Sequence, residues 1–144
     1  MHAIVRLMAV ATLAALATTA QGACTALTLK GVWGFSYDTF RLQDNGYCAG
    51  IGLMTFTPAT SLGSDSVKVS AQRESCNGTP VVIGSARGNY SVVTASCTAN
   101  STNLVYSPSG KSAKLDMNIV AGGTKLQFVM VINGVTLHGE AVKR

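Results

Sequence analysis

Charged residues are scarce in this sequence, and no long hydrophobic run follows its N-terminal segment. Asp, Glu, Lys and Arg make up 12% of the 144 residues, and the formal net charge is +5. The cations are spread along the chain, whereas a nucleic-acid-binding protein concentrates them on one face beside aromatic side chains. After residue 22, no apolar run reaches the ~18 residues that a membrane-spanning helix needs. The sequence therefore predicts neither a nucleic-acid partner nor a membrane span.

The residues that usually carry catalysis or bind metals are also few. His138 is the only histidine after residue 22, and no Cys-x-x-Cys motif is present, so the ligand spacing of a zinc or thiol redox site is missing. No Gly-x-Ser-x-Gly motif is present either. Ser109-Gly110-Lys111-Ser112 resembles the end of a phosphate-binding loop, but Val105 stands where its first glycine belongs. We therefore predict no catalytic residue, metal or cofactor.

The N-terminal segment has the features of a secretory signal peptide. Arg6 precedes an uncharged apolar run over residues 7–17, and Ala20 and Gly22 occupy the small-residue positions of a cleavage site. The sequence thus predicts a signal peptide over residues 1–22 and one domain over residues 23–144. The short, Ala-rich leader is typical of bacterial export to the periplasm or the medium. A lipid anchor on Cys24 is disfavoured, because Gln21 stands where a lipobox has an aliphatic residue.

From residue 29 onward, apolar and polar residues alternate with the period of two that is typical of β-strands. Turn residues recur every ten to twelve positions, and no amphipathic helix of useful length is present. Eight strands are predicted: Leu29 to Phe40, Ala49 to Thr57, Ser66 to Ser75, Ala86 to Ser96, Asn103 to Ser107, Ala113 to Ala121, Thr124 to Ile132 and Val135 to Val142.

Gly and Asn occupy the connections, where tight hairpin turns require a positive φ. The predicted turns are Asp44-Asn45-Gly46, Ser61-Leu62-Gly63, Asn77-Gly78, Pro108-Ser109-Gly110, Gly122-Gly123 and Asn133-Gly134. The last two lie between alternating apolar runs, so the final three strands should form an antiparallel meander.

The same alternation predicts which side chains form the core. They are Trp33, Phe35, Tyr37, Met54, Phe56, Val67, Val69, Ala71, Leu115, Met117, Ile119, Leu126, Phe128, Met130, Ile132, Val135, Leu137, Gly139 and Ala141. Lys114, His138 and Glu140 are among the residues expected to face solvent. Val129 and Val131 make the opposite face of their strand apolar too, which predicts cover by the N-terminal segment or by a second copy of the chain.

Eight antiparallel strands favour closure into a barrel, because closure removes the unpaired edges of the sheet. The predicted fold class is an all-β, eight-stranded antiparallel meander barrel, stabilised by disulfides. The interior of such a barrel is either filled by side chains or holds one small ligand, and the sequence leaves both possibilities open.

Four cysteines in an exported chain predict two disulfides, for which three connectivities exist. If the second and third strands turn around Ser61-Leu62-Gly63, Cys48 lies opposite Cys76. Cys24 and Cys97 then remain to connect the N-terminal segment to the end of the fourth strand.

Two resemblances follow from short motifs. Leu29-Lys30-Gly31-Val32-Trp33-Gly34-Phe35, Gly88-Asn89-Tyr90-Ser91-Val92 with Cys97-Thr98, and the ending Leu137-His138-Gly139-Glu140-Ala141 resemble a group of small exported bacterial β-barrel proteins to which no activity is assigned. That resemblance also favours a bond between Cys24 and Cys97. Gly31-Val32-Trp33 is similar to the opening of lipocalins and other calycins, which implies that the Trp closes one barrel end beneath a late basic residue, Lys143 or Arg144. The second lipocalin motif is missing.

The leading functional hypothesis is an exported binding protein, not an enzyme, for a small apolar or amphipathic ligand. Its candidate binding residues are the aromatic and methionine side chains of the predicted interior: Trp33, Phe35, Tyr37, Met54, Phe56, Met117, Phe128 and Met130. One alternative is a structural or interaction protein that forms homo-oligomers through Val129 and Val131.

A third hypothesis is a barrel enzyme of the cyclase or isomerase kind that uses Tyr37, Asp38, Arg41 or Tyr90 at the mouth. Charged residues expected at that mouth are Asp38, Asp44 and Arg41, and Arg73 beside Glu74.

Overall fold

A computed structural model describes residues 23–41, 46–60 and 63–144. The predicted signal peptide over residues 1–22 and Asp44 lie outside this range, as do parts of two predicted turns. None of the helices among the described residues is long and apolar enough to cross a bilayer.

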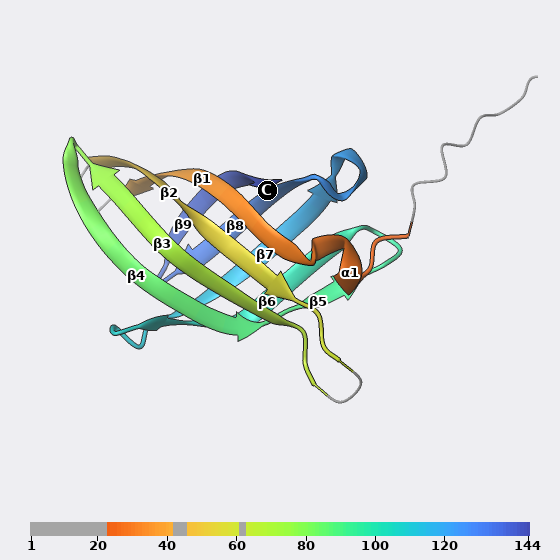
Figure 1. The fold of residues 1–144 in the computed structure, drawn as a ribbon. Coiled ribbons are helices and arrows are strands. Elements are labelled where there is room, and N and C mark those ends of the chain that lie inside the picture. Colours follow the sequence, from red (N-terminus) through yellow and green to blue (C-terminus); the bar gives the residue numbers. More distant parts are fainter. Residues whose placement is uncertain (1–22, 42–45, 61–62) are drawn as a thin grey trace, which may run out of the picture.

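The chain forms one closed antiparallel β-barrel, as predicted (Figure 1). Its elements are α1 (Ala26–Leu29), β1 (Gly31–Arg41), β2 (Gly46–Thr57), β3 (Ser66–Cys76), β4 (Thr79–Asn89), β5 (Ser91–Val93), β6 (Thr98–Ser107), β7 (Ser112–Val120), the 3-10 turn η1 (Ala121–Gly123), β8 (Lys125–Ile132) and β9 (Val135–Lys143). The strand order is β4-β3-β2-β1-β9-β8-β7-β6-β5, and pairing between β4 and β6 closes the sheet. β4 and β5 are separated only by Tyr90 and both pair with β6, so they occupy one position in an eight-stranded barrel.

The predicted hairpins at the C-terminal end are confirmed. β7, β8 and β9 pair in sequence order, and Asn133 and Gly134 both adopt the positive φ that a two-residue hairpin turn requires. Asn77 and Gly78 do the same between β3 and β4.

The prediction for the fourth strand was wrong at both ends. We expected it over Ala86 to Ser96, but β4 begins at Thr79 and Ser96 lies in the turn before β6. The run Val81-Val82-Ile83 lacks the alternation that predicts a strand with one buried face, and the register between β3 and β4 shifts beside it. The next strand begins at Thr98 instead of Asn103.

The predicted core is confirmed at most positions, since fifteen of its nineteen members are buried. Ile132, Val135 and Gly139 are only partly buried. Ala71 was wrongly assigned, because it is exposed and has a φ of 51° at a bulge in β3. After this extra residue the alternation is reversed, so Gln72 and Glu74 point into the barrel.

Inward aromatic rings lie over glycines on neighbouring strands. Tyr37 pairs with Gly50 and Phe35 with Gly52, and a Cβ atom on either glycine would overlap the ring. These rings fill space that larger side chains at the glycine positions would need. The barrel interior around Phe35 and Tyr37 is consequently a packed core.

The helix α1 covers one end of the barrel (Figure 1). Trp33 is fully buried there and donates from Nε1 to the carbonyl oxygen of Leu29 at 2.8 Å. Lys143 Nζ lies 5.5 Å from the centroid of the Trp33 ring and donates to the Thr28 carbonyl at 3.0 Å. Lys143, and not Arg144, is therefore the late basic residue that packs over Trp33.

Both disulfides have the predicted connectivity. Cys24 is bonded to Cys97, which connects the segment before α1 to the turn before β6. Cys48 is bonded to Cys76, its cross-strand partner at the opposite end of the barrel. Two disulfides are typical of an oxidising environment outside the cytoplasm.

Candidate functional site

The open end of the barrel lies opposite α1, where β1, β3, β6 and β8 end (Figure 1). A pocket of about 550 Å³ occupies this mouth. Its lining combines polar and apolar side chains from six strands and two turns: Arg41, Gln72, Glu74, Val82, Ile83, Tyr106, Ser109, Lys111, Ile132, Asn133, Val135 and Leu137. Most small-molecule pockets have volumes of roughly 300–1,000 Å³, so this one is of suitable size.

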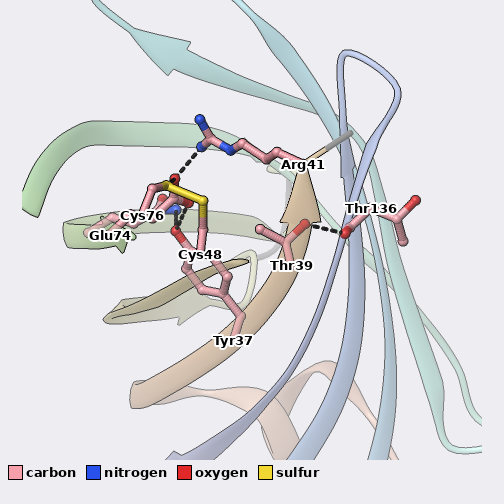
Figure 2. The surroundings of a disulfide bond; sticks show 8 residues. Tyr37, Thr39, Arg41, Cys48, Glu74, Cys76 and Thr136 are labelled. Carbon is pink, nitrogen blue, oxygen red and sulfur yellow. Dashed lines mark hydrogen bonds and ion pairs between the residues drawn. A yellow bond between two sulfur atoms is a disulfide. The ribbon is translucent and has the colours of Figure 1, made fainter. Parts of the chain in front are cut away.

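A buried carboxylate lies at the centre of the polar lining. Glu74 is only 4% exposed and forms an ion pair with Arg41, which extends from the end of β1 (Figure 2). The second carboxylate oxygen of Glu74 accepts a hydrogen bond of 2.6 Å from the Tyr37 hydroxyl. Burial of a charge is tolerated when ion pairs and hydrogen bonds compensate it, and both oxygens of Glu74 are engaged in this way.

Two further side chains extend this hydrogen-bond network across the barrel. Gln72 donates to the Tyr37 hydroxyl at 3.1 Å and accepts from the Tyr106 hydroxyl at 2.9 Å. The Tyr106 oxygen also lies 3.3 Å from the sulfur of Met130. The chain of contacts thus connects β1, β3, β6 and β8 just inside the mouth.

The tyrosines of this network stay protonated. Burial and the hydrogen bond to Glu74 raise the pKa of Tyr37 well above its usual value of 10. Burial raises the pKa of Tyr106 to about 12. At neutral pH both hydroxyls therefore act as hydrogen-bond donors, and neither acts as a general base.

The Cys48–Cys76 disulfide borders the same network (Figure 2). The Cys76 sulfur lies 3.1 Å from Glu74 Oε1, and these two cysteines with Glu74 form a compact group of potential metal ligands. Because both sulfurs are bonded to each other, neither offers a thiolate to a metal. The bridge instead fixes the ends of β2 and β3 at the mouth.

The eight predicted binding residues all point into the barrel and are at most 4% exposed. They pack against one another: Phe35 and Phe128 meet edge to face at 5.8 Å, and Trp33 and Phe56 do so at 6.3 Å. None of the eight lines the mouth pocket, although Tyr37 bonds to two residues that do. Their role in ligand binding stays a prediction.

The charged residues expected at the mouth are brought there only in part. Arg41 and Glu74 line the pocket. Asp38 is exposed on the outer face opposite His138, and Arg73 is exposed beside the inward Glu74. Tyr90 lies at the closed end, where its hydroxyl donates to the Ala26 carbonyl. The hypothesis that placed Asp38 and Tyr90 at the mouth was wrong.

Sequence reasoning missed Gln72 and Tyr106 as site residues. Tyr106 could have been found from the alternation of its strand, because Leu104 and Tyr106 share one face and both are buried. No such signal existed for Gln72, because its inward orientation depends on the bulge at Ala71.

A shallower depression of about 730 Å³ crosses the outer face of β6 to β9. Its lining combines exposed polar side chains, among them Asp116, Gln127 and His138, with apolar residues that include the buried Met117 and Phe128. Val129 on this face is partly buried and Val131 is exposed, so their contact with a second copy stays a prediction. The mouth is the better candidate site, because buried polar groups converge there.

Comparisons with known proteins support the fold. No protein-family model matches this sequence, and no curated protein matches it either. Among solved structures, the chain is similar to a redesigned β-barrel, mFAP1, bound to DFHBI, with a TM-score of 0.58 and 18% sequence identity. The alignment covers 83% of this chain and 98% of that chain. At this level of identity, the likeness is one of fold: an eight-stranded β-barrel.

Proposed function

We propose that this protein binds a small amphipathic molecule in the mouth pocket. The observation that carries the proposal is a pocket of about 550 Å³ where apolar walls and buried polar groups meet. Such a combination is typical of small-molecule sites, in which apolar surface gives affinity and a few polar groups fix orientation. The similar redesigned barrel is bound to DFHBI, which supports a ligand-binding role for a barrel of this kind.

The packed interior forms the floor of the proposed site. Gln72, Glu74 and Tyr106 are at most 4% exposed and are held by hydrogen bonds to their neighbours. A rigid polar floor is organised before the ligand arrives, which lowers the entropy cost of binding. The apolar walls, with Ile83 and Leu137, would contact the apolar part of the ligand.

The proposal is tested with N-phenyl-1-naphthylamine, an uncharged apolar dye that fluoresces when it leaves water. We expect saturable binding to the wild-type protein with one site per chain. Val135→Glu places a strongly hydrated group among the apolar lining residues and should weaken binding of the uncharged dye at least about tenfold, because the carboxylate would lose water when the dye enters. Val82→Glu is a second variant that should also weaken dye binding, because Val82 lines the pocket. Val82 is 76% exposed, so we expect a charge there to leave folding intact.

Val120→Glu is the matched control, because Val120 is also a partly buried valine at a strand end, but lies at the closed end. It should bind the dye as the wild type does. Near-UV circular dichroism confirms that each variant is folded. Absence of saturable binding to the wild type, or equal binding by folded mouth variants and the control, would overturn the proposal.

A further inference from the structure

The mouth pocket carries an excess of positive charge. Arg41 and Lys111 are the cations among the described lining residues, and Glu74 is the one anion. Glu74 is neutralised by its ion pair with Arg41, so the charge of Lys111 is left over. Lys111 is exposed at the rim, whereas Glu74 lies at the floor. The described lining residues thus present a net positive charge to a ligand that enters the pocket.

At the floor of the pocket, the side-chain acceptors of Glu74 and Gln72 are already engaged. Both oxygens of Glu74 are engaged, by Arg41 and by Tyr37, and the Gln72 oxygen accepts from Tyr106. Arg41 uses Nη2 for Glu74, while its Nε is buried and has no hydrogen-bond partner among the described residues. A buried donor without an acceptor is unfavourable, so the site favours a ligand that brings an acceptor.

Glu74 holds the Arg41 side chain across the mouth next to the Cys48–Cys76 bridge (Figure 2). A guanidinium group presents its donors in a planar fork that matches the two oxygens of a carboxylate. Arg41 lines the pocket and a third of its side chain is exposed, so the guanidinium group as a whole is within reach of a ligand in the pocket.

We infer that the ligand is an organic anion with an apolar body, a monocarboxylate in its simplest form. Its carboxylate binds the free donors of Arg41 and the ammonium group of Lys111, and its apolar body contacts Ile83, Val135 and Leu137. A cationic amphiphile is disfavoured, because it would meet two positive side chains and a carboxylate whose oxygens are already engaged. This inference rests on the proposed function and adds the charge class of the ligand.

The test compares three eight-carbon amphiphiles as competitors of bound N-phenyl-1-naphthylamine: octanoate, octan-1-ol and octylamine. They share an apolar chain and differ in the charge of the head group. Octanoate should displace the dye at a concentration at least about tenfold lower than octan-1-ol, since charge-assisted hydrogen bonds contribute at least that factor. Octylamine should be the weakest of the three.

Variants identify the side chains that bind the carboxylate of octanoate. Lys111→Gln should weaken octanoate binding roughly two- to fivefold, the range for exposed ion pairs. Lys114→Gln is its matched control, because Lys114 is an exposed lysine on β7 outside the pocket lining, and it should leave octanoate binding unchanged.

Arg41→Gln alone would leave Glu74 buried without a counterion. The charge-balanced pair Arg41→Gln with Glu74→Gln avoids this, and should reduce the preference for octanoate to the roughly two- to fivefold that Lys111 contributes, while dye binding persists.

The outcomes separate the inference from the proposed function. If the dye binds but octanoate is no better a competitor than octan-1-ol, the anionic ligand is refuted and the binding site stands. The same conclusion follows if the charge-balanced pair keeps the preference for octanoate undiminished. If the dye itself does not bind saturably, the proposed function fails.

Discussion

Loss of the Tyr37 hydroxyl should destabilise the protein more than loss of the Tyr106 hydroxyl, although both are buried in the same network. Tyr37 donates to the charged Glu74 at 2.6 Å and accepts from Gln72 at 3.1 Å. A hydrogen bond to a charged group contributes about 1.5–3 kcal/mol, and a buried donor left without an acceptor adds a further cost. Tyr37→Phe should therefore lower the free energy of unfolding by about 2–4 kcal/mol.

Tyr106→Phe removes a bond between two neutral groups, from Tyr106 to Gln72 at 2.9 Å. Its cost should be about 1–2 kcal/mol, because the lost bond is a neutral one and the buried Gln72 oxygen is left without a donor. Equilibrium unfolding in urea with both disulfides intact measures the two values. The fluorescence of Trp33, the only tryptophan in the sequence, reports the transition.

A double-mutant cycle tests the stated cause. With Glu74→Gln in place, the partner of Tyr37 is neutral, so Tyr37→Phe should cost only about 1 kcal/mol. The reasoning is refuted if Tyr106→Phe costs as much as Tyr37→Phe, or if the effect of Tyr37→Phe is unchanged in the Glu74→Gln background.

Two further predictions concern the packing around Gly139 on β9 and the stability of the protein at alkaline pH. Gly139→Ala should lower the free energy of unfolding by about 1–3 kcal/mol or more, because its Cβ would overlap the Ser36 carbonyl and the Phe128 ring, whereas Gly34→Ala meets only a flexible side chain. Urea unfolding compares the two, and equal costs would contradict the packing argument. The raised pKa of Tyr106, about 12 against an ordinary value of 10, contributes stability that is fully present below pH 10. That stability is lost between pH 10 and 12 at about 1.4 kcal/mol per pH unit, and Tyr106→Phe should flatten the measured decline by that amount.

The buried side chains of β7 and β8 could be predicted because a strand with one face in the core must alternate. Leu115, Met117, Leu126 and Met130 follow that rule without interruption. The Asn133-Gly134 turn was equally predictable, since few residue types accept positive φ at two successive positions.

The polar floor of the candidate site could not be predicted in full. The bulge at Ala71 reverses the orientation of every following residue in β3, and alanine is not a residue that signals a positive φ. A regular strand would have turned Gln72 and Glu74 to solvent. The bulge shifts the register of β3 against β4, so it is a feature of how the two strands pair and not of the β3 sequence alone.

The difference between the closed end and the open end of the barrel was predicted in part from the sequence and in part decided by the tertiary structure. The motif at Gly31 to Trp33 predicted one closed end, and the hairpin argument placed Cys48 opposite Cys76. The position of Arg41 beside Glu74 depends on the register of three strands, which local patterns specify only to within a residue or two.

The sequence by itself determined most strands, most turns and most of the inward face, because these follow from local periodicity and from residues with restricted backbone preferences. The pairing of Cys48 with Cys76 followed from the expected hairpin. Only the tertiary structure decided which polar side chains meet inside the mouth. That outcome depends on one extra residue in β3 and on closure between β4 and β6, and neither leaves a local signal in the amino-acid sequence.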